Sequence, residues 1–447
     1  MTHKPLPVTI VGAGISGLAA AYELTKRGIG VRVREASPRA GGLIQTEHTR
    51  GFTIEAGPDS ILNAKPAALE LIRELGLESE LLAVREGARA FVLKGRTLHP
   101  LPQPSFLGIP LTPQALASYD LLSPEGRARM ALEPTIPPRA TQDDESVGSF
   151  FRRRFGPDTV DLVAQPLLGG IHAGDIEQLS MRSLFPRLLE AERQHGTVMP
   201  TPADSAPRDD KAIKGFAALR GGMSTLVRAL ETRLPAGAIE YNAAVESLVG
   251  SDGDCVIVAA PAHAAASLLA SIDAEAARLC SLVPYVSTAS IALAWPRDAV
   301  PHPLNGTGFV VARRHSDARI TACTWVSSKW ESRAPEGWAL LRAFIGGAHD
   351  PDVVDLTDDE LIAIARRDLS NVMGITAAPS LTRVHRWRRA GAQHLVGHLD
   401  RVMEIERRLA PRGIFVAGSG FRATGIPDCV ADGRRVAAEA TAYLETG

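Results

Sequence analysis

The sequence predicts an α/β chain, α+β overall, and three observations carry this prediction. A β-branched run at residues 8–11 leads into a glycine-rich turn at residues 12–17 and then a helical run. A second, alternating run follows and ends in the acid Glu35. Far along the chain, residues 285–345 are rich in apolar strand patterns. The first two observations are the parts of a Rossmann-like βαβ unit that binds a dinucleotide, and the third predicts a separate mixed sheet.

Each glycine of the turn has a physical role in this interpretation. Gly12 permits a tight turn, Gly14 has no Cβ to hold the backbone away from a pyrophosphate, and Gly17 lets the helix pack closely. The amides and positive dipole at the helix start attract phosphates. We therefore expect the turn to bind the cofactor through Gly12, Ala13, Gly14, Ile15, Ser16 and Gly17.

Glu35 and the residues after it narrow the choice of cofactor. A carboxylate at the end of the second strand can accept hydrogen bonds from both ribose hydroxyls, and it repels a 2′-phosphate, which favours FAD or NAD over NADP. Residues 35–42 then bring an arginine and two glycines, and residues 51–60 bring a second small-residue turn. This arrangement resembles the amine-oxidase and protoporphyrinogen-oxidase superfamily of flavoproteins. The resemblance implies FAD contacts at Glu35, Ala36, Arg39, Gly42, Gly57, Pro58, Asp59 and Ser60.

Composition limits the partners and the compartment. Lys and Arg number 49 against 50 Asp and Glu, so no overall charge favours nucleic acid as a partner. The four cysteines lack CxxC spacing, which predicts a reducing compartment with neither a disulfide framework nor a zinc site. Residues 1–7 leave no room for a signal peptide, and no window has the apolar length of a membrane-spanning helix. We expect a soluble, cytoplasmic protein and leave peripheral membrane contact open.

A helix is expected at residues 65–76, just beyond the second glycine turn. Pro66 suits its first position, and Gly76 suits the C′ position that ends it. Lys65 therefore stands at a helix N-terminus, where its ammonium group and the helix dipole would together attract anions. A solvated lysine is an equally simple interpretation.

The middle of the chain predicts a domain crossing and a helical insertion. Residues 91–102 resemble a hairpin, and prolines then interrupt residues 100–113. A helix at residues 146–155 carries three consecutive arginines, which we expect to form a solvated face. The glycines of residues 165–175 would let the backbone approach a flat ligand, although a plain turn explains them nearly as well.

The second half of the chain is expected to add strands to the same sheet as the N-terminal βαβ unit, the sheet that binds the cofactor. Strands are predicted at residues 243–249 and 255–261, and an apolar strand at residues 413–419 completes this sheet. Amides at the start of the last helix, near residues 424–430, would face the C2 carbonyl of a flavin. The expected domains are a Rossmann-like FAD-binding domain (1–85, 210–280 and 385–447), a mixed-sheet substrate domain (86–110 and 281–384) and a helical domain (111–209).

Along nearly its whole length the chain is similar to the FAD-dependent protoporphyrinogen and coproporphyrinogen III oxidases, most of all to the soluble coproporphyrinogen type. Besides the N-terminal motifs, the stretches that match are residues 57–60, 97–100, 150–156, 166–175, 321–325, 334–337 and 425–429. The resemblance implies a six-electron oxidation of a porphyrinogen to a porphyrin in heme biosynthesis, with O2 as acceptor and H2O2 as product. Hydride transfer to flavin N5 needs orientation and a dry pocket more than acid–base groups, so we expect no catalytic side chain.

Substrate choice within this family depends on carboxylates. Coproporphyrinogen carries four propionates and protoporphyrinogen two, so the former needs more cationic or amide partners. Lys65 and residues 321–325 favour the coproporphyrinogen type, whereas Arg89 is slightly offset from an arginine that pairs with a propionate in protoporphyrinogen-oxidising relatives. The resemblance implies substrate contacts at Lys65, Arg89 and Gly170, and further FAD contacts at Val245, Trp387, Gly418, Ile426, Pro427 and Asp428.

One departure from the family pattern and several alternatives stay open. Residues 250–254 are shorter than the usual family segment, which would trim a small sheet and weaken retention of FAD. The alternative functions are a protoporphyrinogen IX oxidase, a flavin amine oxidase or carotenoid-type desaturase, and a flavin-retaining heme-pathway scaffold. An aromatic content of 5% argues mildly against the aromatic cage of an amine oxidase. Contact with ferrochelatase, the oligomeric state and the natural electron acceptor are left open by the sequence.

Overall fold

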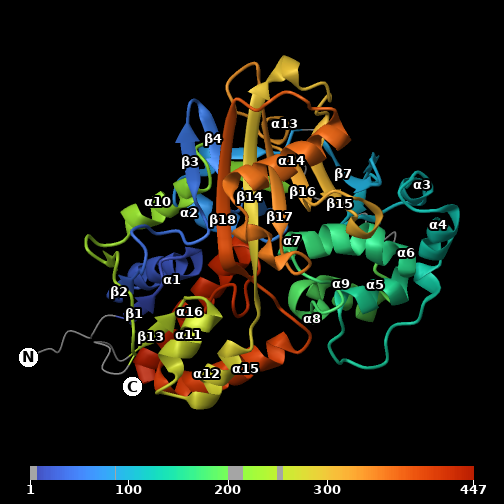
Figure 1. The fold of residues 1–447 in the computed structure, drawn as a ribbon. Coiled ribbons are helices and arrows are strands. Elements are labelled where there is room, and N and C mark those ends of the chain that lie inside the picture. The colour runs from blue at the N-terminus through green and yellow to red at the C-terminus, as the bar shows by residue number, and fades with distance from the viewer. Residues whose placement is uncertain (1–7, 86, 200–214, 249–254, 447) are drawn as a thin grey trace, which may run out of the picture. The chain divides into compact units, whose positions relative to one another are not determined.

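The structure is a computed structural model that describes residues 8–85, 87–199, 215–248 and 255–446 (Figure 1). The chain divides into two compact units, the first formed by Met1–Ala83, Ile213–Pro284 and His398–Gly447, and the second by Val84–Ala212 and Tyr285–Gly397. The shortened segment at residues 250–254 lies outside the described residues. The expected helical domain and the expected substrate domain therefore fall within one unit, and residues 385–397 belong to that unit rather than to the first.

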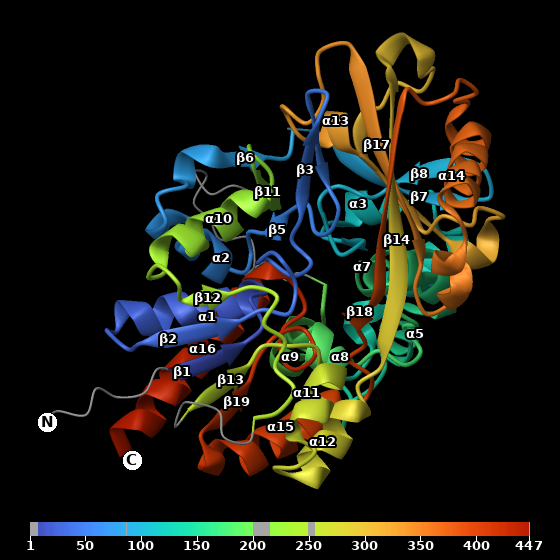
Figure 2. The ribbon, with the colours of Figure 1, turned by 60° about the vertical axis from the view of Figure 1, so that its left-hand side comes forward.

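The first unit is built on a five-stranded parallel sheet (Figure 2). Its order is β12-β2-β1-β13-β19, with bounds Ile239–Glu240, Val31–Arg34, Val8–Val11, Val256–Val258 and Ile414–Val416. Strands β1, β13 and β19 are buried along their whole length, as expected for parallel strands covered on both faces. The predicted Rossmann-like core is therefore confirmed, and it joins strands from both ends of the chain.

Helices α1 (Ile15–Lys26) and α16 (Ile426–Thr446) pack against each other very closely. A Cβ at Gly433 of α16 would lie 2.3 Å from the carbonyl oxygen of Ser16, which only a glycine avoids. The other elements of this unit are β3 (Thr46–Thr49), β4 (Phe52–Glu55), β5 (Ile61–Leu62), α2 (Ala67–Glu74), η1 (Glu78–Glu80), β6 (Leu81–Ala83), β11 (Phe216–Leu219), α10 (Ser224–Arg233), α11 (Ala262–Leu269), α12 (Ala274–Ser281), α15 (His398–Leu409) and η8 (Ala410–Arg412).

One predicted strand of the first unit is wrong. Residues 243–248 have no regular secondary structure, although a strand was expected there. Just beyond the end of β2, the amide of Ala243 donates to the carbonyl of Glu35 and the amide of Asn242 donates to the carbonyl of Ser37, and the regular pairing of β12 with β2 does not continue.

The second unit contains a seven-stranded mixed sheet. Its order is β18-β14-β17-β16-β15-β7-β8, with bounds Leu381–Ala392, Tyr285–Pro296, Trp338–Gly346, Ala322–Trp325, Gly306–Val311, Arg89–Lys94 and Thr97–Pro100. Every pairing is antiparallel except that of β15 with β7. The predicted mixed sheet is confirmed.

Helices and short strands complete the second unit. They are β9 (Ser105–Phe106), β10 (Ile109–Pro110), α3 (Pro113–Ala117), α4 (Pro124–Ala131), η2 (Glu133–Thr135), α5 (Val147–Phe155), α6 (Pro157–Thr159), the π-helical η3 (Val160–Gly169), α7 (Gly170–His172), α8 (Met181–Leu184), α9 (Pro186–His195), η5 (Arg297–Ala299), η6 (Arg313–His315), α13 (Val326–Lys329), η7 (Pro351–Asp355) and α14 (Asp358–Met373). No helix among the described residues is both long and apolar enough to cross a membrane.

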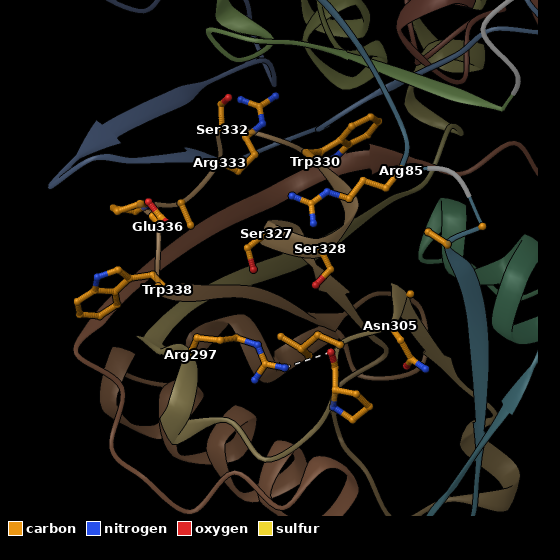
Figure 3. Close-up of a pocket in the computed structure, with 18 residues that line it drawn as sticks. Arg85, Arg297, Asn305, Ser327, Ser328, Trp330, Ser332, Arg333, Glu336 and Trp338 are labelled. Atoms are coloured by element: carbon orange, nitrogen blue, oxygen red, sulfur yellow. Dashed lines mark hydrogen bonds between the residues drawn. The ribbon is translucent and has the colours of Figure 1, made fainter.

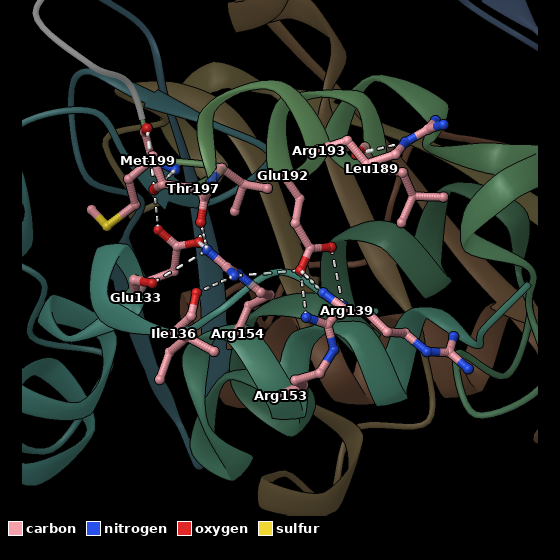
Figure 4. Close-up of polar contacts among 12 residues, drawn as sticks. Glu133, Ile136, Arg139, Arg153, Arg154, Leu189, Glu192, Arg193, Thr197 and Met199 are labelled. Carbon is pink, nitrogen blue, oxygen red and sulfur yellow. Dashed lines mark hydrogen bonds and ion pairs between the residues drawn. The ribbon is translucent and has the colours of Figure 1, made fainter. Parts of the chain in front are cut away.

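Of the three arginines of α5, Arg152 is exposed as the sequence predicted, whereas Arg153 is half-buried and Arg154 is not on a solvated face. Arg154 is fully buried, and its guanidinium group donates to the carboxylates of Glu133 and Glu192 (Figure 4). Arg153 also donates to Glu192, and Thr197 donates to Glu133. These ion pairs tie α5 to η2, α9 and the residues that follow α9.

Candidate cofactor-binding site

The glycine turn between β1 and α1 leaves open space where a ligand would approach. Gly12 has φ +103°, and a Cβ there would lie 2.8 Å from the carbonyl oxygen of Ala259. A Cβ at Gly17 would lie only 2.0 Å from the carbonyl oxygen of Gly12, whereas a Cβ at Gly14 would meet no heavy atom within 4 Å. The fold itself therefore requires glycine at positions 12 and 17. At position 14 the protein leaves room that its own packing does not fill.

The N-terminus of α1 offers backbone donors beside this space. The first hydrogen bond within the helix runs from the amide of Leu18 to the carbonyl of Gly14, at 2.9 Å. Gly14 forms a parallel bridge with Gly41, and the amides of Ser16 and Gly17 follow it in the first turn of the helix, where a helix offers no acceptor of its own. Such amides, together with the positive end of the helix dipole, suit a pyrophosphate.

Glu35 is held in place at the end of β2. One carboxylate oxygen accepts the amide of Ala13 at 2.7 Å, and the other accepts the amide of Ser37 at 2.8 Å. Each oxygen keeps a second lone pair, so the carboxylate can still accept hydrogen bonds from ribose hydroxyls. Glu35, the acid predicted to bind the ribose hydroxyls, is thus hydrogen-bonded directly to the glycine turn. Ala36, next in the chain, is exposed.

Arg39 shapes the loop that follows Glu35. Its guanidinium group donates to the carbonyls of Ala40 at 3.0 Å, Gly42 at 2.7 Å and Ile44 at 3.1 Å. Burial lowers the pKa of Arg39, and the nearby Glu35 charge opposes this shift. A Cβ at Gly42 would come within 3.3 Å of the Gly14 Cα, so this loop lies on the glycine turn. An FAD contact by Arg39 or Gly42 stays a prediction.

The second small-residue turn, Gly57, Pro58, Asp59 and Ser60, lies between β4 and β5 and is partly exposed. Sequence reasoning missed the residue just before it, Glu55. Its buried carboxylate accepts the amide of Met223 and the hydroxyl of Thr46, each at 2.8 Å. A carboxylate at the end of an otherwise apolar strand was the signal that could have revealed this anchor.

The C-terminal turn meets the N-terminal glycine turn within the first unit. A Cβ at Gly418 would lie 3.6 Å from the Ser16 hydroxyl oxygen. The Gly418 amide donates to the buried carboxylate of Asp432 at 2.8 Å, and Arg435 pairs with the same carboxylate. Burial raises the pKa of Asp432, while Arg435 opposes the rise. Asp432 and Arg435 hold the turn in place, and sequence reasoning missed both.

Two residues expected to contact different ligands form an ion pair. The ammonium group of Lys65 lies 2.7 Å from a carboxylate oxygen of Asp428, which also accepts the hydroxyl of Thr424 at 2.9 Å. The side chains of Lys65 and Asp428 remain 35% and 25% exposed. Pro66 is the N-cap of α2 rather than its first residue, so Lys65 lies just before the helix. Lys65 is therefore a partnered cation that still faces outward, whereas Ile426 and Pro427 beside Asp428 are buried.

The remaining predicted residues are dispersed. Val245 belongs to the segment without regular structure and is half-buried. Trp387 lies in β18, Arg89 begins β7 and Gly170 begins α7, all in the second unit. A Cβ at Gly170 would meet no atom within 4 Å, so Gly170 is open to a ligand. The roles of these four residues stay predictions.

Comparisons with known proteins agree over the full chain. The family described as flavin containing amine oxidoreductase matches residues 15–441. A coproporphyrinogen III oxidase of Bacillus subtilis (strain 168) is 39% identical over 98% of this chain and 98% of its own. One of Staphylococcus aureus (strain NCTC 8325 / PS 47) is 34% identical over 98% of this chain and 99% of its own. The crystal structure of a proposed protoporphyrinogen oxidase from Exiguobacterium sp. 255-15 has a TM-score of 0.86 at 29% identity, over 98% of this chain and 99% of that one.

Proposed function

The chain belongs to the flavin containing amine oxidoreductase family, and from this premise we propose that it oxidises coproporphyrinogen III to coproporphyrin III with O2, giving H2O2. The full-length similarity to two coproporphyrinogen III oxidases carries this proposal. The protein is an oxidoreductase, and family membership confirms the predicted cofactor, FAD. We place the reaction in heme biosynthesis and the protein in the cytoplasm.

The chain's own residues bind and orient the cofactor in this proposal. The amides at the start of α1, beside the open space at Gly14, would hold the pyrophosphate, and Glu35 would accept hydrogen bonds from the ribose. The turn at Gly418 and the amides at the start of α16 would hold the isoalloxazine end and stabilise the negative charge that develops on reduction. When bound, FAD supplies the hydride acceptor, so the protein needs no nucleophile or general base.

Lys65 is the proposed cationic partner of a substrate propionate. The Lys65 ammonium group lies 2.7 Å from a carboxylate oxygen of Asp428. The Lys65 side chain is still 35% exposed, which leaves room for a second carboxylate to contact it. Arg89 and Gly170 are proposed as further substrate contacts from the second unit. A substrate with four propionates gains more from such a cation than one with two.

Purified protein with FAD and O2 tests the proposal. Coproporphyrinogen III and protoporphyrinogen IX are supplied separately, and the rise of the porphyrin Soret absorbance is followed. Faster oxidation of coproporphyrinogen III supports the proposal, and no oxidation of either compound removes it.

Protoporphyrinogen IX is the second candidate substrate, because the chain shares its fold with a proposed protoporphyrinogen oxidase at a TM-score of 0.86. A higher rate with that compound in the same assay would favour it. A flavin amine oxidase or a carotenoid-type desaturase would give no porphyrin at all. A heme-pathway scaffold would also give none.

A further inference from the structure

A polar cavity in the second unit has no part in the proposed oxidation. Its volume is about 580 Å³, which lies in the range of small-molecule sites. All of its lining residues belong to the second unit, and residues 334–337, which match the family pattern, form part of its wall. Most of the proposed flavin contacts lie in the first unit.

Three polar side chains line the cavity without partners in the described part of the chain: the guanidinium group of Arg85, the hydroxyl of Ser328 and the amide of Asn305. Figure 3 shows Arg85 and Ser328 pointing into the same space. All three can donate hydrogen bonds to an oxygen-rich group. The indole N–H of Trp330, buried in the wall, likewise lacks an acceptor among the described residues.

Arg297 brings a further positive charge to the wall of the cavity. Arg297 donates to the carbonyls of Val300 at 2.6 Å and of His302 at 3.1 Å. It also donates to the carbonyl of Pro303 at 3.1 Å, which Figure 3 shows as a dashed line. These carbonyls carry no full charge, so Arg297 adds positive potential to the cavity while fixing its wall. Among the described lining residues, arginines stand at positions 85, 297 and 333, and Glu336 is the one carboxylate.

We propose that this cavity is a binding site for a small oxyanion, a phosphate or carboxylate group, which Arg85 holds together with Ser328 and Asn305. A guanidinium group forms paired hydrogen bonds with either anion. The Ser328 hydroxyl and the Asn305 amide then donate hydrogen bonds to the anion oxygens that the guanidinium group does not contact. The residues of this site all belong to the second unit, and the proposal does not depend on which porphyrinogen is oxidised.

Calorimetric titration of the flavin-loaded protein tests the site with two probes, pyrophosphate and citrate. Bound flavin already fills the glycine turn, so pyrophosphate has no place there. We expect saturable 1:1 binding of at least one probe with the flavin absorbance bands unchanged. Arg85→Gln should raise the Kd at least about 10-fold, since it removes charged hydrogen bonds, and Ser328→Ala should raise it less.

Arg193→Gln is the matched control, because it removes the same charge from an exposed helix position outside the cavity. Its Kd should stay within about twofold of the unsubstituted protein. Binding of pyrophosphate alone or citrate alone supports the site and identifies the anion. The proposal is overturned if neither probe binds saturably, or if Arg85→Gln and Arg193→Gln change the Kd equally.

Discussion

At the scale of single residues, the glycines of the first turn differ in what they do. The sequence predicted a role for each from its place in the motif, but only the structure separates packing from binding. A Cβ at Gly17 would collide with the Gly12 carbonyl, whereas a Cβ at Gly14 meets empty space. Gly14→Ala should therefore fold with a nearly unchanged melting temperature but lose most of its bound flavin, measured as flavin absorbance per protein after gel filtration.

Gly17→Ala is the control for that experiment. It should lower the melting temperature by several degrees, because α1 must move away from the turn. Full flavin content in Gly14→Ala would contradict the view that position 14 faces the cofactor.

Lys65 carries a second prediction at this scale. Lys65→Ala should raise the KM for coproporphyrinogen III more than that for protoporphyrinogen IX, because it removes a cation that carboxylates contact. Steady-state kinetics with both substrates measures this difference, and Lys65→Arg should retain most of the preference. An equal change for both substrates would reject Lys65 as a propionate partner. The pairing with Asp428 could not be predicted, because the two residues are 363 positions apart.

At the scale of elements, the ion pairs of α5 and α9 make stability depend on pH. Burial alone would raise the pKa of Glu192, but its hydrogen bond and charge interaction with Arg153, with help from Arg154, hold that pKa below its ordinary value. A carboxyl with a lowered pKa stabilises the folded state above its ordinary pKa of about 4.3, and this contribution disappears as the pH falls through the folded value.

Glu192→Gln should therefore cost about 3 kcal/mol of unfolding free energy at pH 7. Its deficit relative to the unsubstituted protein should shrink as the pH falls below about 4. Urea unfolding followed by circular dichroism across this range measures the difference. A deficit that is constant with pH would show that Glu192 acts through packing rather than charge.

The local sequence pattern predicted where helices form better than it predicted which residues their side chains contact. The bounds of α14, Asp358–Met373, follow from local pattern, because Thr357 and Glu360 form a capping box at its start and Gly374 ends it. The arginines of α5 were assigned to solvent because their partners, Glu133 and Glu192, come from other elements. Residues 243–248, where a strand was expected, have no regular secondary structure, so an extended pattern alone does not make a strand.

At the scale of the whole molecule, the first unit is assembled from three stretches of chain. The sequence predicted this return, because each end of the chain carries a strand, a glycine turn and a helix. It also assigned Arg89 and Gly170 to other domains than the FAD-binding one, whereas Trp387, which it assigned to the FAD-binding domain, lies in the second unit. The roles predicted for these three residues came from the resemblance to a family, because motif spacing in the sequence gives no role for them.

Removal of residues 414–447 tests this assembly. The truncated chain lacks β19 and α16, which exposes the edge of β13 and the apolar face of α1. We expect it to retain no flavin after gel filtration and to lose the cooperative thermal unfolding of the first unit. Retained flavin would contradict a site built from both ends of the chain.

The central claim is that a flavin held by this unit oxidises a porphyrinogen at the expense of O2. The most direct measurement follows coproporphyrin III and H2O2 together in one air-saturated reaction of the purified protein with coproporphyrinogen III. Removal of six hydrogens in three two-electron steps predicts three molecules of H2O2 for each porphyrin. Porphyrin without peroxide would contradict O2 as the acceptor, and no porphyrin at all would contradict the function itself.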